Sequence, residues 1–513
     1  MNWLAPLPLL LAFALRLLPG PRIIDDAYIT FRYAQNLARG AGLVYNPGEM
    51  VLGTTTPLYA ALLAGLSRLL QTDDLPHLAW VLNALLDVVG VALLFWIGNK
   101  LTGKDGRSVT PIGLGAALLW AVAPFSVTFA IGGLETSLVI TLLLASFALH
   151  AAGRDNWAAL ALGLGTLTRP DVLVAALLIF GNVGLGWLFR TIRPGQPRGP
   201  GKRFPYRPAA IFAATLLPWV LFATVVYGGP LPHSMAAKSV AYRLPAEAAL
   251  VRLLQHYGTP FHEHLIFGSG WVLIGLILYG TLLAIGCLSS VRKNGRTWPL
   301  FLYPVLYAAV YSVANPLIFR WYLSPPMPFF FLGILVGVRA LAGELAGKRA
   351  RRWITILAAV LAVASLGNAW TRHPPGPPDR PAPEMAWIEL ETLYRQVALD
   401  LKESLAATGD RLAAGDIGTL GWFTNAPILD LVGLVSPQAQ EYYPLPAEAY
   451  DINYAVPADY VLAEQPEVIV ILEVYGRKTL ALDGRFGEAY ELWRTYPTDI
   501  YGSEGMLVYR RSP

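Results

Sequence analysis

The chain has 513 residues, of which 55% are hydrophobic and only 14% charged, and its formal net charge is +5. With a mean hydropathy of +0.47, this composition excludes an ordinary soluble domain and indicates a polytopic membrane protein. The basic residues cluster between apolar segments, so we interpret the charge as a topology signal and expect no nucleic-acid partner. Cys287 is the single cysteine, which excludes disulfides and cysteine-based metal sites.

The N-terminal apolar run extends from Trp3 to Leu18 and lacks the basic start and cleavage site of a signal peptide. We therefore expect an uncleaved first membrane helix. Asp25 and Asp26 follow shortly after it. Two adjacent carboxylates just outside a membrane helix are costly to place near lipid, which makes this pair a functional-site hypothesis.

Residues 20–71 are expected to form a structured first outer loop with two helices. Apolar residues share one face of 27–39 and polar residues the other, which is the pattern of a surface helix. The apolar stretch 56–70 is short for a span and carries Arg68, so we expect an interfacial helix on the outer surface.

Later apolar runs of roughly spanning length bring the expected total to about eleven membrane helices. They cover 78–97, 112–131, 134–152, 157–167, 172–189, 209–227, 271–288, 300–314, 329–345 and 353–369. Four loops between them are basic and are expected in the cytoplasm. These loops contain Lys100, Lys104 and Arg107; Arg190, Arg193, Arg198, Lys202, Arg203 and Arg207; Arg292, Lys293 and Arg296; and Lys348, Arg349, Arg351 and Arg352. This places the N-terminus inside and the C-terminus outside the plasma membrane.

The composition changes after Ala369, which predicts a domain boundary. We expect a membrane module over 1–370, a Pro-rich linker over 371–385 and a small extracytoplasmic α/β domain over 386–513. In the last domain, apolar residues at helical spacing cover 390–405, and strands are predicted at 412–415, 428–432, 468–474 and 506–509. The expected fold is therefore mainly α, a helical membrane bundle with a C-terminal α/β domain.

Polar residues that interrupt the apolar pattern gather at the outer ends of the helices in this topology. Asp25, Asp26 and Glu135 are the predicted catalytic residues, because carboxylates offer a general base. Glu135 could instead occupy a first helical turn. Cationic, imidazole and phenol groups can hold a phosphate through charge-assisted hydrogen bonds. The predicted substrate-binding residues are Tyr28, Arg32, His233, Lys238, Arg320 and Tyr322.

Several of these residues also have a structural interpretation. Asp26 could cap the helix that follows it, and Lys238 and Arg320 could be interfacial anchors. Tyr322 could belong to an aromatic belt, and His233 alone favours a structural role. Paired acids can also hold Mg²⁺ or Mn²⁺ through oxygen ligands. Because few further ligands are available, we expect metal-independent chemistry without a cofactor.

The segment from Asp25 to Glu49, followed by Gly53 to Pro57, resembles the first outer loop of the GT-C superfamily of membrane glycosyltransferases. The closest resemblance is to bacterial proteins similar to the cell-wall arabinofuranosyltransferases. Further segments occur in the order that these proteins show, namely 133–136, 167–171, 230–234 and 320–322. The segments 415–421 and 429–434 resemble the outer domain of the same group. Those relatives often read Glu-Gly-Tyr-Thr-Asn where this chain has Leu52 to Pro57, so the resemblance does not extend to the choice of sugar.

The resemblance implies an inverting sugar transferase on the outer face of the membrane. Its donor would be a polyprenyl-phosphate-linked sugar, its acceptor a glycan, lipid or protein, and membrane lipids would surround it. In that family an acidic residue of the first outer loop is the catalytic base, which corresponds here to Asp25 or Asp26. The leaving phosphate requires cations, for which Lys238 and Arg320 are the candidates.

Two other functions are compatible with a polytopic chain. A transporter or flippase of a lipid-linked sugar would also place charges in a bundle. Such proteins typically show internal repeats and broken helices near the midplane, whereas no repeat is evident here and the acids cluster at one face. A receptor whose outer domain does the work would leave Asp25 and Asp26 without a role.

Overall fold

The computed structural model describes residues 4–103, 108–192, 204–262, 269–314 and 318–513. The predicted loop cations Lys104, Arg107, Arg193, Arg198, Lys202 and Arg203 and the start of the first apolar run at Trp3 lie outside these ranges. The described chain forms two compact units, and each combines segments that are distant in sequence. Unit 1 comprises 1–20, 80–218 and 246–384, and unit 2 comprises 21–79, 219–245 and 385–513. The first outer loop and 219–245 therefore belong to the same unit as the C-terminal domain.

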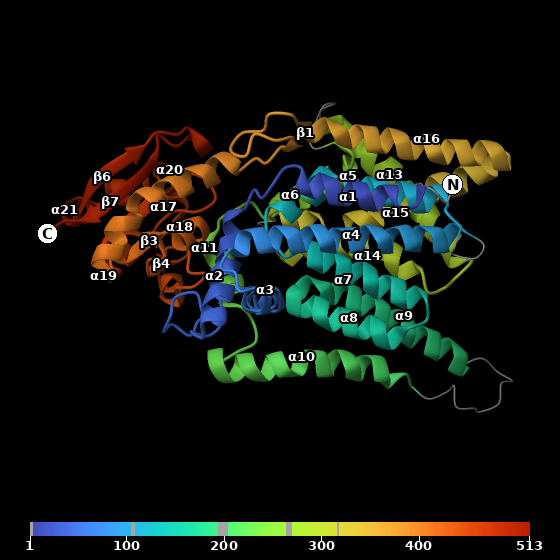
Figure 1. Cartoon of the computed structure of the whole chain (residues 1–513), viewed down its shortest axis with the longest axis horizontal. Helices are drawn as coiled ribbons and strands as arrows, with labels where there is room; N and C mark the ends of the chain where they lie inside the picture. Colours follow the sequence, from blue (N-terminus) through green and yellow to red (C-terminus); the bar gives the residue numbers. More distant parts are fainter. Residues whose placement is uncertain (1–3, 104–107, 193–203, 263–268, 315–317) are drawn as a thin grey trace. The chain divides into compact units, whose positions relative to one another are not determined.

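Unit 1 is helical (Figure 1). Its helices are α1 (Leu7–Leu17), α5 (Pro111–Val122), α6 (Pro124–Ile131), α7 (Thr136–Ala151), α8 (Asp155–Thr168), α9 (Leu173–Ile192), α12 (Ala248–Gly258), α13 (Ser269–Val291), α14 (Trp298–Ala314), α15 (Met327–Leu345) and α16 (Lys348–Leu366), while α4 (Leu75–Thr102) and α10 (Tyr206–Tyr227) are shared with unit 2. Short 3₁₀ turns cover η2 (Pro170–Val172), η4 (Arg320–Leu323) and η5 (Gly367–Ala369). The strands β1 (Trp370–Thr371) and β2 (Ala382–Pro383) form a small antiparallel pair.

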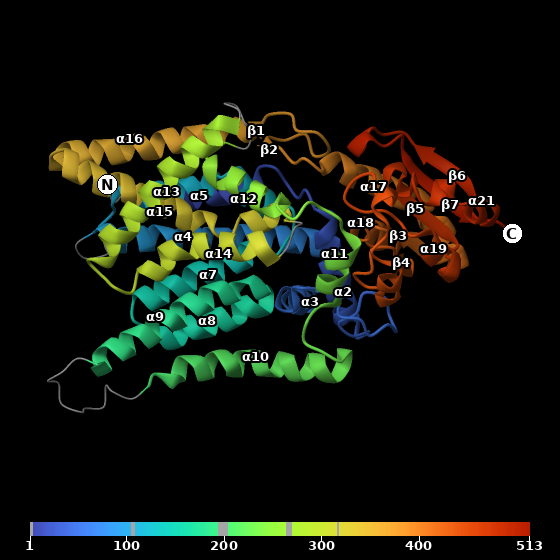
Figure 2. The same cartoon turned by 180° about the vertical axis from the view of Figure 1, so that it is seen from behind.

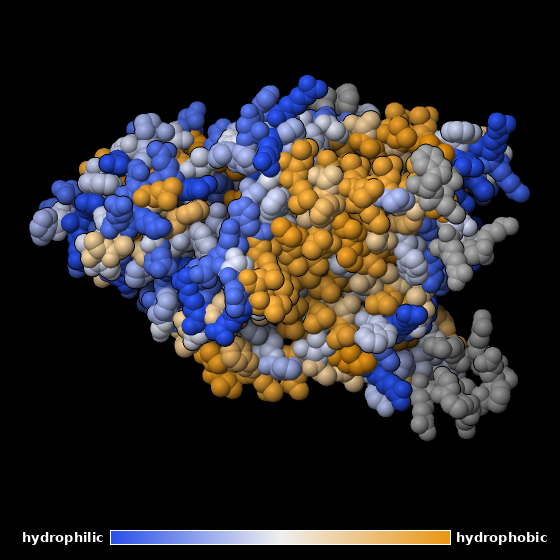
Figure 3. Space-filling view, in the orientation of Figure 1, coloured by the Kyte–Doolittle hydropathy of each residue, from blue (hydrophilic) through white to orange (hydrophobic). Residues whose placement is uncertain are grey.

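The helices of unit 1 are those of a multi-pass membrane protein. Six helices in the described part of the chain are long and apolar enough to span a bilayer, and the bent pair α5–α6 makes a seventh if it is one span. The shorter helices α1, α7, α8 and α14 coincide with the remaining predicted runs. Fewer helices are therefore long enough to span a bilayer than the eleven expected. Hydrophobic residues cover the visible face of these helices (Figure 3). On α4, Val81, Leu85 and Val89 are exposed.

Arg16 and Asp87 form a buried ion pair inside the helical unit. Arg16 Nε lies 2.8 Å from Asp87 Oδ2, and neither side chain is more than 3% exposed. The same guanidinium donates to the Ala121 carbonyl and the Ser126 hydroxyl. Charges within a bundle are tolerated when they are paired and hydrogen-bonded. This pair ties α1 to α4 and to the α5–α6 bend.

Unit 2 is an α/β unit. Its five-stranded sheet has the order β4-β3-β5-β7-β6. The strands are β3 (Leu412–Ala414), β4 (Ile428–Asp430), β5 (Val468–Leu472), β6 (Tyr490–Tyr496) and β7 (Met506–Arg511). β3 pairs in parallel with β4 and β5, while β7 is antiparallel to β5 and β6. The helices are α2 (Asp25–Arg39), α3 (Pro57–Leu70), α11 (His233–Ala241), α17 (Ile388–Thr408), α18 (Gly418–Thr424), α19 (Ala458–Glu464), α20 (Glu473–Gly476) and α21 (Gly484–Ala489), with 3₁₀ turns at η6 (Pro437–Tyr442), η7 (Ala447–Ala449), η8 (Leu480–Leu482) and η9 (Ile500–Gly502).

The predicted helical bundle with a small C-terminal α/β domain is confirmed. The predicted helix at 27–39 exists, but the prediction that it lies at the surface is wrong. Both faces of this helix, α2, are buried, because α3 and α18 both pack against it. Polar Arg32 and Asn36 are buried because their side chains donate to backbone carbonyls.

Candidate functional site

The acidic pair lies in the first turn of α2. Ile24 precedes the helix as its N-cap residue, so neither Asp25 nor Asp26 is the cap. Negative charges in a first turn are favourable because they face the positive end of the helix dipole. Gly40, with φ of +84°, ends α2 in the left-handed region that favours glycine. The two carboxylates then have different surroundings.

Asp25 is a clamp between α2 and α18. Its Oδ2 atom accepts from the N–H of Gly418 at 2.9 Å, and its Oδ1 atom accepts from the N–H of Thr419 at 2.6 Å. Its own N–H donates to Glu391 Oε1 of α17 at 2.7 Å. Both carboxylate oxygens are therefore committed to the start of α18, which Figure 1 shows beside α2.

Glycines allow α2 and α18 to approach closely. A Cβ atom on Gly418 would collide with the Asp25 carbonyl, and one on Gly421 would collide with the Tyr45 hydroxyl. The Tyr45 hydroxyl donates to the Ile417 carbonyl at 2.6 Å. The glycine spacing in 415–421 is thus explained by backbone contact with the first outer loop.

The carboxylate of Asp26, in contrast, remains available to a substrate. Its side chain is 34% exposed, and the Nζ atom of Lys238 lies 3.8 Å from its Oδ2 atom. Lys238 extends from α11, which Figure 2 shows beside α2. Within the described ranges, no backbone N–H donates to the Asp26 carboxylate oxygens. A partly exposed carboxylate of this kind next to a cation can accept a proton from a bound hydroxyl.

A second acidic group comes from the sheet. Asp416 follows the C-terminal end of β3, and Asp430 ends β4. Because β3 and β4 are parallel, their carboxyl ends lie next to each other. Asp416 and Asp430 are therefore at the same end of the two strands. Tyr394 of α17 donates to Asp416 Oδ2 at 2.5 Å. Burial raises the pKa of Asp416 to about 6, opposed by this hydrogen bond and assisted by the negative charge of Asp26.

Asp430 has a structural explanation. Its carboxylate accepts from the N–H groups of Val432 at 2.8 Å and Val435 at 2.9 Å. Burial raises the pKa of Asp430 to about 6, although these backbone bonds lower it. For Asp25, burial raises the pKa to about 7, assisted by the charge of Asp416. Unit 2 therefore concentrates acids whose ionisation is costly, which is typical of functional sites.

Aromatic residues surround these acids. Tyr242 packs edge-on against Tyr454, with ring centroids 5.7 Å apart, and Tyr454 stacks on Tyr475 at 3.9 Å. Burial raises the pKa of Tyr242, and the charges of Asp416 and Asp26 raise it further. Tyr454 and Tyr475 are buried, so these rings pack behind the acids and support them from within the domain.

The structure gives Arg32 a role that differs from the predicted one. It donates to the carbonyls of Tyr45 at 2.9 Å, Gly421 at 2.7 Å and Ala426 at 2.7 Å. The guanidinium also lies 4.5 Å above the Tyr45 ring. In our interpretation Arg32 is a structural clamp and not a substrate ligand, since its donors are occupied by the backbone.

The other two predicted residues of unit 2 also have neighbours. Tyr28 is buried among Phe31, Trp422 and Phe423. His233 Nε2 lies 2.9 Å from the side-chain amide nitrogen of Gln440, and desolvation lowers the pKa of His233. Of the predicted residues in unit 2, the structure brings Asp25, Asp26 and Lys238 into one neighbourhood.

The remaining predicted residues belong to unit 1. Glu135 Oε1 lies 3.7 Å from Arg169 Nη1, and the Arg169 guanidinium lies 4.5 Å above the ring of Tyr322. Arg169 also forms an ion pair with Asp171 at 2.6 Å, within the turn between α8 and α9. Arg320 begins η4 and is partly exposed.

Metal binding has limited support from the arrangement of the acids. Among the residues outside the undescribed gaps, no three His, Cys, Asp or Glu side chains are grouped to hold an ion. Both oxygens of Asp25 face N–H donors, which a cation would have to displace. Metal-independent chemistry stays a prediction.

Sequence reasoning missed Asp416, Glu391 and Tyr394. Asp416 lies in a segment whose resemblance to the outer domain was noted, but nothing in the sequence linked it to Asp26. Glu391 and Tyr394 occupy positions of an amphipathic helix, where neither residue stands out. Glu391 contacts Asp25 across 366 positions, and Tyr394 contacts Asp416 across 22, so their roles depend on tertiary contacts.

Comparisons with known proteins give three kinds of match. The family model described as domain of unknown function DUF8728 matches residues 384–509. The terminal β-(1→2)-arabinofuranosyltransferase of Mycobacterium tuberculosis is 33% identical over 122 residues, which cover 24% of this chain and 20% of that protein. Apo ArnT from Cupriavidus metallidurans superposes over 99% of this chain and 97% of its own, with a TM-score of 0.56 and 12% identity. The Archaeoglobus fulgidus oligosaccharyltransferase, solved with Zn and sulfate, covers 99% of this chain and 73% of its own, with a TM-score of 0.53 and 13% identity.

These structural matches confirm the expected class of fold. The chain has the fold of the GT-C membrane glycosyltransferases. The matched part of the curated arabinofuranosyltransferase is one fifth of that protein, and the family model covers only the C-terminal domain.

Proposed function

We propose that the protein is a glycosyltransferase that moves a sugar from a polyprenyl-phosphate donor to a cell-envelope acceptor. The observation that carries the proposal is the partly exposed carboxylate of Asp26, which lies beside Lys238. Asp26 belongs to the first outer loop of a GT-C fold. The sequence match to an arabinofuranosyltransferase supports sugar transfer as the reaction class.

In this proposal Asp26 is the general base. Its carboxylate accepts the proton of an acceptor hydroxyl while that oxygen attacks the anomeric carbon. The bond between the anomeric carbon and the phosphate oxygen breaks, and polyprenyl phosphate leaves with the electron pair. A single displacement inverts the anomeric centre. Lys238 stabilises the negative charge on the leaving phosphate, and Arg320 stays a second predicted phosphate ligand.

Unit 1 offers an apolar pocket that suits an isoprenoid chain. It has a volume of about 210 Å³ and lies among α12, α13, α14 and α15. Leu253 and Tyr257 of α12 line it together with Phe330 of α15. Arg252 of the same helix donates to the Ile318 carbonyl at 3.0 Å, which fixes α12 next to the segment that leads into Arg320.

The proposed orientation places the reaction on the outer face of the plasma membrane, with the N-terminus in the cytoplasm. It can be tested by introducing Glu488→Cys, an exposed position of α21, into a Cys287→Ser background. A membrane-impermeant thiol reagent is expected to label this cysteine in intact cells. Labelling only after lysis would contradict the orientation.

The function itself is tested by assaying membranes with radiolabelled polyprenyl-phosphate sugars, pentoses and hexoses separately. The proposal expects one donor to give labelled glycan, lipid or protein and released polyprenyl phosphate. If no donor is consumed while labelled lipid changes leaflet in proteoliposomes, the protein is a flippase of a lipid-linked sugar.

A further inference from the structure

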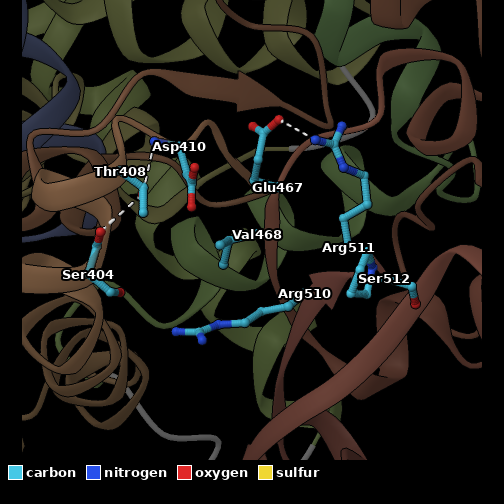
Figure 4. Close-up of a pocket in the computed structure, with 9 residues that line it drawn as sticks. Ser404, Thr408, Asp410, Glu467, Val468, Arg510, Arg511 and Ser512 are labelled. Carbon is cyan, nitrogen blue, oxygen red and sulfur yellow. Dashed lines mark hydrogen bonds and ion pairs between the residues drawn. The ribbon is translucent and has the colours of Figure 1, made fainter.

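A pocket of about 360 Å³ lies in the C-terminal domain (Figure 4). It is built from the end of α17, the residues before β3, the start of β5 and the end of β7. Leu412 pairs with Val468, and Val468 pairs with Arg510, so the register of the sheet brings these segments together. Ser404, Thr408, Asp410, Glu467, Val468, Arg510, Arg511, Ser512 and Pro513 line the pocket.

This pocket is distinct from the acidic site around Asp26. Asp410 precedes β3, whereas Asp416 follows the opposite end of the same strand. A three-residue strand alone extends about 10 Å, given a rise of about 3.3 Å per residue. The two sites are therefore at opposite ends of β3, and the pocket has no part in the proposed proton transfer.

The charges that line the pocket are balanced. Glu467 is committed, because its Oε1 atom lies 3.0 Å from Arg511 Nη2 and its Oε2 atom accepts from the Arg411 N–H at 3.0 Å. Within the described ranges, neither the Asp410 carboxylate nor the Arg510 guanidinium forms an ion pair. The Arg510 guanidinium lies 4.2 Å above the ring of Trp493, which leaves the N–H groups at its edge for a ligand, together with the Asp410 carboxylate.

This combination fits hydroxyl groups better than an anion. A carboxylate accepts hydrogen bonds from neighbouring hydroxyls, and a guanidinium donates to their oxygens. Thr408 Oγ1 donates to the Ser404 carbonyl at 3.0 Å and accepts from the Asp410 N–H at 3.3 Å, so this hydroxyl has one lone pair left for a ligand. A phosphate would gain from Arg510 but would be repelled by Asp410. The volume lies near the lower end of the range of about 300–1,000 Å³ for small-molecule sites, which suits one or two sugar rings.

We propose that this pocket binds a neutral saccharide unit of the acceptor, away from the transfer site. Only the assignment of the saccharide to the acceptor rests on the proposed function. The binding itself depends on Asp410 and Arg510. A second contact of this kind raises the effective concentration of a long acceptor chain at the transferase.

The test measures binding to the full-length protein in detergent by isothermal titration calorimetry. The probes are arabinose and galactose disaccharides as methyl glycosides, and inorganic phosphate. Wild type is compared with Asp410→Asn and Arg510→Gln. Arg494→Gln is the matched control, because Arg494 lies 4.5 Å above the Trp493 ring just as Arg510 lies 4.2 Å above it, but Arg494 does not line the pocket.

The proposal expects saturable binding of at least one disaccharide, weakened about tenfold or more by either pocket variant and retained by the control. Absence of saccharide binding, equal binding by all variants, or binding of phosphate alone would overturn it. If one pocket variant does not fold, the binding measured with the other variant tests the proposal. Saccharide binding without any transfer activity would support the pocket and contradict the proposed function. With activity, the KM for long acceptors is expected to rise in the pocket variants while kcat is unchanged.

Discussion

The Nζ atom of Lys238 lies 3.8 Å from Oδ2 of Asp26, although 212 positions separate the two residues in the sequence. Asp25 next to it points both oxygens at the backbone of α18. Neighbouring carboxylates thus have separate tasks, because one is occupied by main-chain donors and the other is exposed beside a cation. This division leads to predictions that distinguish catalysis from stability.

Replacing Asp25 is expected to affect stability first. Asp25→Asn puts an N–H₂ group where an oxygen accepts a main-chain hydrogen bond, which costs about 1–3 kcal/mol for a bond to a charged group. The thermal midpoint in detergent should fall. Glu389→Gln is the control, since Glu389 is exposed in the first turn of α17. An unchanged midpoint for Asp25→Asn would show that the clamp contributes little.

Lys238 is predicted to act on the donor phosphate. Lys238→Gln removes a charge-assisted contact of about 1.5–3 kcal/mol, so kcat/KM for the donor should fall roughly tenfold to a hundredfold. The thermal midpoint should hardly change, because the lysine is partly exposed. Lys402→Gln on the exposed face of α17 serves as the comparison. Equal kinetics for the two variants would remove Lys238 from the site.

The buried acids predict how stability depends on pH. Burial raises the pKa of Asp416 from 3.8 to about 6, so the native protein holds a proton that the unfolded chain releases near pH 4. Stability should therefore decrease as pH rises from about 4 to about 6, and Asp25, whose pKa burial raises to about 7, extends the decrease. Asp430, Tyr394 and Lys238 also act on the pKa of Asp416. The contribution of Asp416 to the pH dependence is therefore measured as the difference between wild type and a variant at this position.

The comparison uses thermal midpoints of wild type and Asp416→Asn at pH 4.5 and pH 7. The variant cannot titrate at this position, and its midpoint should fall less between the two pH values. A fall as large as in wild type would mean that Asp416 does not carry the predicted proton.

Transfer is predicted to need no added metal. Activity should persist in excess chelator, since both oxygens of Asp25 already accept main-chain hydrogen bonds. Rates with and without EDTA check this directly. Loss of activity that Mn²⁺ restores would contradict it and would place an ion among the acids of unit 2.

Local pattern was sufficient for the long helices and for most strands, but it did not predict the shorter helices α11, α12 and α18 to α21. The first outer loop was expected to hold helices at 27–39 and 56–70, and α2 and α3 occupy these positions. Four strands were predicted near β3, β4, β5 and β7. β6 was missed because only its end residues Tyr490 and Tyr496 are buried, so its alternation is weak.

The site could be predicted only in part. Asp25 and Asp26 stand out beside a membrane helix, but the sequence treats them alike. The contact between Asp25 and Gly418 joins segments 393 positions apart, and Tyr394 of α17 donates to Asp416 at the end of β3. By residue type Arg32 is a candidate phosphate ligand, yet its guanidinium donates its hydrogen bonds to backbone carbonyls. Such assignments depend on tertiary contacts that periodicity does not encode.

The most direct test of Asp26 as the base is single-turnover transfer from the identified polyprenyl-phosphate sugar, with Asp26→Asn and Asp25→Asn compared with wild type. We predict that Asp26→Asn lowers the rate about 10²- to 10⁴-fold, as loss of a general base does, while its thermal midpoint and donor binding stay near those of wild type. Transfer by Asp26→Asn at the wild-type rate, or a comparable loss confined to a stably folded Asp25→Asn, would contradict this assignment.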